Sequence, residues 1–199
     1  VHGVKTFQPV EYSIMPDRIE AGSFMIASAI TNGDITINGV IPEHIKPLTA
    51  KLCEIGAEID VNGNSLRIRG NGHYTATDVK TLPFPGFPTD MQAQFGGLLS
   101  TASGTGLIFE NRFMHAQELC RMGANIKVEG HCAVIEGTPE LTGAKVVASD
   151  LRAGAALVLA GLNAKGTTEV LDIYHIDRGY ENLDGKLRSL GADIQRVSY

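Results

Sequence analysis

The chain has 199 residues, of which 43% are hydrophobic and 20% are charged, a composition typical of globular proteins rather than disordered or fibrous ones. Its net charge is −5, and its lysines and arginines are scattered singly, which argues against nucleic acid as a partner. No apolar run is long enough to span a membrane, and residues 1–5 lack the pattern of a signal peptide, so we expect a cytoplasmic protein without a membrane partner.

One pattern, Gly-Ala followed by a polar residue and Ile, occurs three times along the chain. It begins at Gly56, Gly123 and Gly191, which are 67 and 68 residues apart. An apolar stripe of helical period precedes each glycine, and Gly is the favoured residue just after a helix. The sequence therefore predicts three copies of one structural unit, each with an amphipathic helix that ends at its glycine.

In chain order, each copy contains the same predicted elements. An Asp at position 17, 90 or 150 opens a helix of small residues, because Asp is a favoured N-cap. A short strand follows at 35–37, 107–109 and 168–170, and the amphipathic helix comes next. In the first two copies a hairpin then follows, with strands at 59–61 and 66–68 and at 126–128 and 133–135.

Each repeat is therefore predicted as β-α-β-α-β-β, with approximate boundaries 1–75, 76–140 and 141–199. Three such repeats around shared buried helices predict a single α/β domain over 1–199. Three cysteines without metal-ligand spacing (Cys53, Cys120 and Cys132) are interpreted as reduced thiols. No metal-ligand pattern and no Gly-rich nucleotide loop is found, so neither a metal nor a cofactor is expected.

Two irregularities interrupt the repeat. The third copy ends at 197–199 without a returning strand, which predicts an unpaired sheet edge. The middle copy is shorter, because Gly104 and Gly123 are 19 residues apart whereas Gly33 and Gly56 are 23 apart. We expect the missing residues to fall between Gly104 and Arg112. A Gly96-Gly97 pair also lies inside a predicted helix, where each Gly costs about 1 kcal/mol relative to Ala.

Long motifs in the chain resemble the UDP-N-acetylglucosamine 1-carboxyvinyltransferase family of enolpyruvyl transferases. The resemblance covers essentially all 199 residues, and the motifs that carry it lie at 16–22, 87–95, 109–115, 150–153 and 175–181. It implies an inside-out α/β barrel built of three β-α-β-α-β-β units. The family protein has two such domains, and this chain resembles one of them. The resemblance therefore implies a complementary domain, with a reactive Cys on a mobile loop, as a partner.

The family reaction implies roles for particular residues. The 3-hydroxyl of UDP-N-acetylglucosamine adds to C2 of phosphoenolpyruvate while C3 is protonated, and phosphate is then eliminated to leave an enolpyruvyl ether. Asp90 matches the family aspartate at the acceptor hydroxyl, which makes it the candidate catalytic residue; the alternative is that it only caps its helix. Arg152 and Arg178 match arginines that contact phosphoenolpyruvate, since a guanidinium binds carboxylate or phosphate through two donors; the alternative is two solvated surface arginines.

Three further residues are candidate substrate contacts. Arg112 and Ile108 match the loop that lines the sugar site, and the shortened middle repeat is expected to displace both. Arg18 lies in the first repeat at the position that resembles that of Arg152 in the third, which suggests a contact with substrate. The alternative is that Arg18 only forms a structural ion pair with Glu20. None of the three cysteines matches the reactive Cys, so the chain alone is expected to have little or no turnover.

Two other functions remain open. The shortened middle repeat favours a non-catalytic binding or scaffold module of the same fold. Within enzymes, the alternative is a relative of 3-phosphoshikimate 1-carboxyvinyltransferase, against which the motifs at 109–115 and 175–181 argue.

Overall fold

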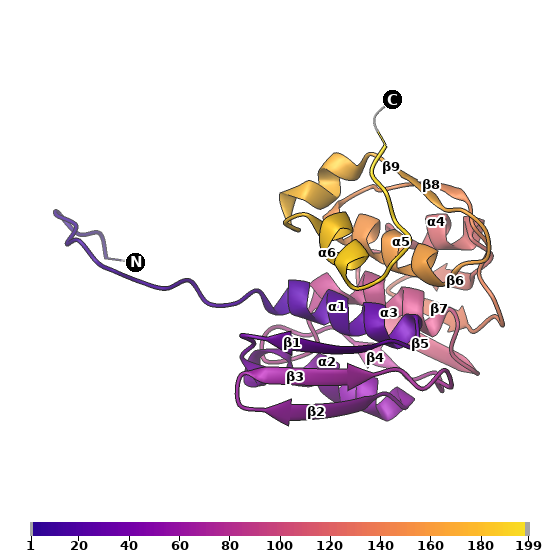
Figure 1. The fold of residues 1–199 in the computed structure, drawn as a ribbon, viewed down its shortest axis with the longest axis horizontal. Helices are drawn as coiled ribbons and strands as arrows, with labels where there is room; N and C mark the ends of the chain where they lie inside the picture. Colours follow the sequence, from indigo (N-terminus) through magenta and orange to yellow (C-terminus); the bar gives the residue numbers. More distant parts are fainter. Residues whose placement is uncertain (1, 198–199) are drawn as a thin grey trace.

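Three buried helices pack against one another at the centre of the computed structural model, which describes residues 2–197 (Figure 1). They are α1 (Arg18–Ile30), α3 (Gln92–Leu99) and α5 (Leu151–Asn163). Their glycines, alanines and serines leave room for the close approach of neighbouring helices. The predicted small-residue helices are thus confirmed, and each belongs to a different repeat.

The first repeat forms a sheet on one side of these helices. Its elements are β1 (Asp34–Asn38), α2 (Pro42–Ile55), β2 (Glu58–Asn62) and β3 (Ser65–Arg69). The three strands are antiparallel in the order β1-β3-β2. Leu66 and Ile68 are buried against the helices, whereas Arg67 between them is exposed and pairs with Asp34 at 2.6 Å. This alternation is typical of a sheet with one buried face.

The second repeat has the full predicted order of elements. Around α3 it contains β4 (Val79–Lys80), the short 3₁₀ helix η1 (Thr89–Met91), β5 (Thr105–Phe109), α4 (Ala116–Arg121), β6 (Asn125–Glu129) and β7 (Cys132–Glu136). The sheet order is β4-β5-β7-β6, with β4 parallel to β5 and the other pairs antiparallel. Both predicted hairpins are present in the first two repeats.

The shortage in the middle repeat falls in a helix rather than a strand. β5 has five residues, as β1 has, and all five pair with β7, so that Ile108 lies opposite Ala133. By contrast, α4 has 6 residues whereas its counterpart α2 has 14. The expectation that the shortage displaces Ile108 from its register is therefore wrong. Because a helix can lose turns without shifting a neighbouring ladder, the sheet keeps its pairing.

The third repeat contains β8 (Lys145–Val147), β9 (Glu169–Leu171), the 3₁₀ helix η2 (Ile173–Arg178) and α6 (Leu183–Ser189). β8 pairs with β9 in parallel. Residues 192–197 do not form the expected edge strand, and residues 198 and 199 lie outside the described part. Without a returning strand there is no ladder partner, and Arg196 instead binds Asp177 and Asp184 at 2.8 and 3.0 Å.

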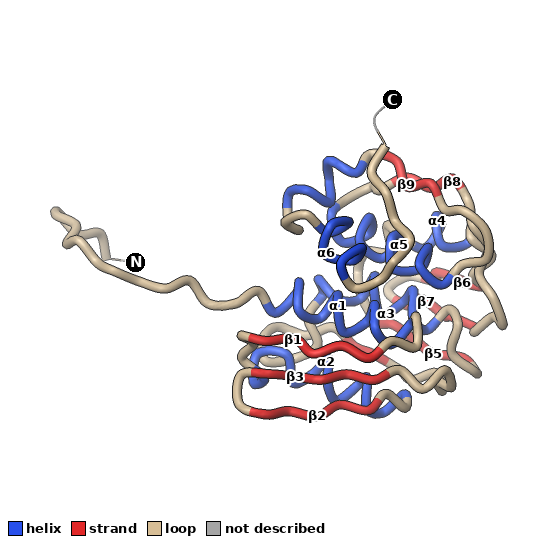
Figure 2. The backbone as a smooth tube through the Cα atoms, viewed as in Figure 1, coloured by secondary structure: helices blue, strands red, loops and turns tan. Residues whose placement is uncertain are grey.

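The termini and the core complete the architecture. Residues 2–17 form no helix or strand and run away from the helices (Figures 1 and 2). One large core cluster draws buried residues from all three repeats, including Leu48, Phe95 and Leu187. All three cysteines are free. Within residues 2–197, no helix combines the length and apolar character needed to cross a membrane.

Candidate functional site

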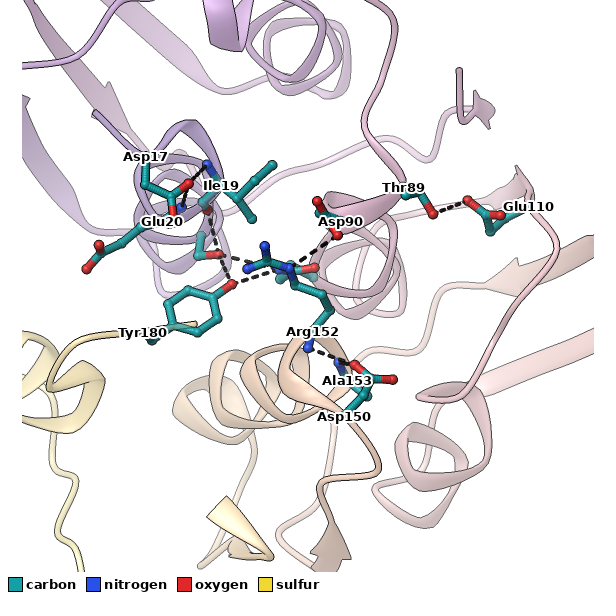
Figure 3. Close-up of polar contacts among 12 residues, drawn as sticks. Asp17, Ile19, Glu20, Thr89, Asp90, Glu110, Asp150, Arg152, Ala153 and Tyr180 are labelled. Atoms are coloured by element: carbon teal, nitrogen blue, oxygen red, sulfur yellow. Dashed lines mark hydrogen bonds and ion pairs between the residues drawn. The ribbon is translucent and has the colours of Figure 1, made fainter. Parts of the chain in front are cut away.

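The candidate site lies where the three central helices begin. In Figure 3, the Arg152 side chain points toward Asp90, while Asp17 and Asp150 mark the starts of α1 and α5. Arg152 lies in the first turn of α5, and its Nε is 3.4 Å from Oδ1 of Asp90. The start of α1 is also close, because a Cβ placed on Gly22 would lie 3.0 Å from the Met91 sulfur. The positive ends of three helix dipoles therefore meet at this point.

The three aspartates have different structural roles. Asp17 Oδ1 accepts hydrogen bonds from the Ile19 and Glu20 amides, and Asp150 Oδ1 does so from the Arg152 and Ala153 amides. Both are therefore helix caps, as predicted. Asp90 instead lies within η1, whose N-cap is Pro88, and accepts no capping hydrogen bond. The capping alternative for Asp90 is wrong, and its half-exposed carboxylate stays available beside Arg152.

Arg152 has donors that its neighbours do not use. Its side chain is only 20% exposed, yet Nε and Nη1 are buried without a hydrogen-bond partner among the described residues. The contact with Asp90 is an ion pair without hydrogen-bond geometry. Buried guanidinium donors are costly to leave unpaired. The arrangement therefore suits an anion that supplies acceptors to Arg152.

Arg178 lies in the third repeat, as Arg152 does, on a segment that packs against α5. It is the last residue of η2, which packs against α5, and it is exposed. The next residue, Gly179, lies so close to α5 that a Cβ there would be 2.3 Å from Leu151 Cδ1 and 3.8 Å from Arg152 Nη1. The backbone after Arg178 thus runs directly past Arg152. Two of the predicted substrate arginines therefore belong to backbone segments that lie side by side.

Arg18 lies nearby but faces a different neighbour. Its guanidinium carbon is 5.1 Å from the centre of the Phe84 ring, and its buried Nη1 has no hydrogen-bond partner among the described residues. The ion pair with Glu20 is not formed, because Glu20 binds Lys186 at 2.7 Å. Two cavities beside Arg18 each hold about 10 Å³, room for one water rather than a substrate.

Arg112 and Ile108 are placed less favourably for contact with Arg152. Ile108 is fully buried in β5, so its side chain is part of the core. Arg112 is exposed in the loop before α4, and its carbonyl accepts a 3.0 Å hydrogen bond from Gln92 Nε2. This bond ties the loop to the start of α3. No contact joins the side chain of either residue to the Asp90 and Arg152 pair within residues 2–197.

Sequence reasoning missed the polar side chains beneath the site. Ser23, Gln94 and Tyr180 form a hydrogen-bonded group, and the Arg152 guanidinium carbon is 5.5 Å from the Tyr180 ring centre. Tyr180 belongs to the apolar stripe before Gly191 and to the motif at 175–181, and neither pattern predicts a buried hydroxyl that forms hydrogen bonds. The polar residues inside small-residue helices were the available signal, because a polar side chain on a fully buried helix needs a partner. The described residues contain no cluster of His, Cys, Asp and Glu suited to a metal ion.

Comparison with known proteins identifies the family. A family model for EPSP synthase (3-phosphoshikimate 1-carboxyvinyltransferase) matches residues 1–187. A Desulfosudis oleivorans protein named UDP-N-acetylglucosamine 1-carboxyvinyltransferase is 56% identical over 202 residues, covering 100% of this chain and 48% of its own length. A Caldanaerobacter subterraneus relative of that name is 56% identical over 200 residues, covering 98% of this chain and 48% of its own length. The chain spans about half the length of these relatives.

Solved structures agree with this comparison. The enolpyruvyl transferase NikO from Streptomyces tendae matches with a TM-score of 0.84 and 27% identity, over 94% of this chain and 46% of that one. EPSP synthase from Acinetobacter baumannii matches with a TM-score of 0.71 at 19% identity, over 94% of this chain and 45% of that one, which shows a shared fold. The predicted enolpyruvyl transferase fold is confirmed. The chain belongs to the EPSP synthase family of enolpyruvyl transferases.

Proposed function

We propose that this chain is one domain of a UDP-N-acetylglucosamine 1-carboxyvinyltransferase, which transfers the enolpyruvyl group of phosphoenolpyruvate to the 3-hydroxyl of the sugar. The observation that carries the proposal is the ion pair between Asp90 and Arg152, with Oδ1 and Nε 3.4 Å apart. The Asp90 carboxylate caps no helix, and two donors of the guanidinium have no hydrogen-bond partner among the described residues. One group can accept a proton and the other can bind an anion. The similarity to relatives of that name at 56% identity supports the choice of substrates.

In this proposal Asp90 handles the proton of the acceptor hydroxyl. A carboxylate near a reacting hydroxyl can act as a general base. Arg152 and Arg178 bind the carboxylate or phosphate of phosphoenolpyruvate, helped by the helix N-termini that meet there. Arg112 contacts the sugar nucleotide from its exposed loop. Arg18 and Ile108 act at the edge of the site, Ile108 through the strand that it anchors rather than through its buried side chain.

The complementary domain completes this site in the proposal. The chain covers 48% of the length of its relatives, and the Asp90 carboxylate is 48% exposed. An exposed site leaves water around the anion and weakens each electrostatic contact. Closure by a second domain would remove that water. We therefore expect little or no turnover by this chain alone.

The test is phosphate release from phosphoenolpyruvate and UDP-N-acetylglucosamine. The chain is assayed alone and after mixing with the separately produced complementary half of a relative. Activity in the mixture alone is the expected result, and Arg152→Gln in this chain should abolish it. Turnover by the chain alone would contradict the need for a second domain. If the two halves associate but their mixture releases no phosphate, the scaffold function is favoured.

The same assay separates the proposal from its closest enzymatic alternative. The family model carries the name of 3-phosphoshikimate 1-carboxyvinyltransferase, so shikimate 3-phosphate is the competing acceptor. The acceptors are offered singly to the reconstituted pair, and phosphate release with the UDP-sugar alone is expected. Preference for shikimate 3-phosphate would overturn the choice of substrate while leaving the enolpyruvyl transfer in place.

A further inference from the structure

Three buried polar side chains, one from each repeat, meet beneath Arg152. Ser23 comes from α1, Gln94 from α3 and Tyr180 from the segment after η2, and their exposed fractions are 1%, 0% and 2%. The Tyr180 hydroxyl lies 2.8 Å from Ser23 Oγ, and Gln94 Nε2 lies 3.1 Å from the Tyr180 oxygen. We name these three residues the central polar cluster. Because buried polar groups are costly when unpaired, the cluster resists displacement of any member.

The hydrogen bonds of the cluster have a definite direction. Ser23 Oγ donates to the Ile19 carbonyl at 2.9 Å, as a serine in a helix commonly does. With that proton used, the Tyr180 hydroxyl donates to Ser23 and accepts from the Gln94 amide. The phenol oxygen is therefore held by both a donor and an acceptor. Two bonds on one atom at the tip of a rigid ring fix the position of the outer end of that ring.

The ring of Tyr180 in turn borders the guanidinium of Arg152. The guanidinium carbon is 5.5 Å from the ring centre, within the range of a cation–π contact. Figure 3 shows the guanidinium between Tyr180 and Asp90, which is the ion-pair partner at 3.4 Å. The backbone at Gly179 lies close to Nη1, since a Cβ there would be 3.8 Å away. A long arginine side chain is thus restricted from three directions.

We infer that the central polar cluster orients Arg152, with Tyr180 as a positioning residue that acts through the guanidinium rather than through substrate. The inference rests on the proposed function, in which Arg152 binds an anionic substrate. A guanidinium binds carboxylate or phosphate through two parallel donors, so its direction matters as well as its charge. Loss of the Tyr180 hydroxyl would leave the ring in place but free it to tilt.

The decisive variant is Tyr180→Phe, tested in the enzyme assembled with its complementary half. The KM for phosphoenolpyruvate should rise about fivefold or more, in line with couplings measured between residues in contact. The KM for UDP-N-acetylglucosamine should stay within about twofold, because Arg152 holds the other substrate. In an Arg152→Gln background, Tyr180→Phe should have no further effect on binding of phosphoenolpyruvate, measured as its dissociation constant.

Tyr74→Phe is the matched control, because Tyr74 is 7% exposed and its hydroxyl donates to the Ala29 carbonyl at 2.9 Å, away from Arg152. It removes a comparable buried hydrogen bond and should leave both KM values unchanged. Equal effects of Tyr74→Phe and Tyr180→Phe would overturn the inference by revealing general destabilisation. An effect of Tyr180→Phe that persists without Arg152 would also overturn it, since Tyr180 would then act independently.

A second measurement needs no activity and uses the chain alone. The Arg152 Nε–H signal, assigned by its loss in Arg152→Gln, reports side-chain motion through ¹⁵N relaxation. Tyr180→Phe should lower its order parameter, and Tyr74→Phe should not. An unchanged order parameter would overturn the inference. Lack of turnover in the assembled wild type would instead refute the proposed function and leave this measurement to decide the positioning role.

Discussion

At the scale of single residues, His115 is buried without a charge partner strong enough to keep it protonated. It is 2% exposed at the start of α4, and burial lowers its pKa from 6.5 to about 4, although the charge of Asp150 opposes the shift. The unfolded chain binds this proton near pH 6.5, whereas the folded chain does so only near pH 4. The free energy of unfolding should therefore fall by about 3 kcal/mol between pH 7 and pH 4.

Urea denaturation at a series of pH values measures this loss. His115→Gln removes the titrating ring, so its stability should change less over the same pH interval. His131→Gln, at an exposed position in the turn between β6 and β7, is the control and should keep the dependence of the wild type. Parallel pH curves for wild type and His115→Gln would show that His115 is not the group responsible.

Replacement by alanine is expected to lower stability at Asp17 and enzymatic activity at Asp90. Asp17 Oδ1 binds two amides at the start of α1, at 2.7 and 3.3 Å, so Asp17→Ala should lower the free energy of unfolding by about 1 kcal/mol. Asp90 caps no helix, and Asp90→Ala should leave stability nearly unchanged. In the assembled enzyme, Asp90→Ala should lower kcat about 100-fold or more, the range for loss of a general base.

Urea denaturation and phosphate release, measured on the same two variants, separate the roles. The proposal for Asp90 fails if Asp90→Ala destabilises the chain as much as Asp17→Ala while kcat stays near that of the wild type. Asp90→Asn, which keeps the shape of the side chain without its charge, distinguishes lost proton transfer from lost packing.

At the scale of elements, the contacts of α3 with its neighbours explain the glycine at position 96 but not the one at position 97. A Cβ on Gly97 would lie 3.7 Å from the Ala156 carbonyl oxygen, an ordinary contact, whereas one on Gly96 would lie 3.1 Å from His115 Nε2. Gly97→Ala should therefore stabilise the chain by about 0.5–1 kcal/mol through its higher helix propensity. Gly96→Ala should destabilise it, because the buried imidazole has little room to move.

Thermal or urea unfolding of the two alanine variants gives a direct comparison, and each serves as the other's control. Gly97→Leu introduces a side chain that is too large for the space between α3 and α5, so this variant should be less stable than the wild type. Equal stability changes in Gly96→Ala and Gly97→Ala would mean that helix propensity alone decides, and that His115 does not require a glycine at position 96.

Most elements could be predicted because their signals are local. Gly56, Gly123 and Gly191 all adopt the left-handed conformation, with φ of 118°, 91° and 99°, as expected of residues that end helices. The absence of the expected edge strand after Gly191 could not be predicted, since a strand depends on a partner elsewhere in the fold. The position of the missing residues in the middle repeat was equally hidden, because spacing between glycines does not distinguish strand from helix.

The candidate site was only partly predictable for a related reason. An Asp precedes each central helix, yet the sequence does not distinguish Asp17 and Asp150, which cap their helices, from Asp90, which does not. The members of the central polar cluster lie in different repeats, so their hydrogen bonds are invisible to any local pattern. The resemblance to a known family led to the prediction of roles for Asp90 and Arg152, and the structure shows the residues around them.

At the scale of the whole molecule, the three repeats share one core. The largest core cluster includes residues of every repeat, and the central polar cluster joins α1, α3 and the segment after η2, one segment from each repeat. No repeat buries its helix without the other two. Independent unfolding of one repeat would therefore expose apolar surface on the remaining pair. We expect residues 1–199 to unfold as one cooperative unit, as small single domains usually do.

Fluorine-labelled tyrosines test this cooperativity, since the chain has five Tyr and no Trp. Tyr74 reports on the first repeat, where its hydroxyl binds the Ala29 carbonyl, and Tyr180 reports on the third. Their resonances, assigned with the two Tyr→Phe variants, should disappear at the same urea concentration. Leu187→Ala in α6 should shift both midpoints equally, because Leu187 is 2% exposed in the shared core. Loss of the Tyr180 signal while Tyr74 stays native would show instead that the third repeat unfolds independently and that the single-domain prediction is wrong.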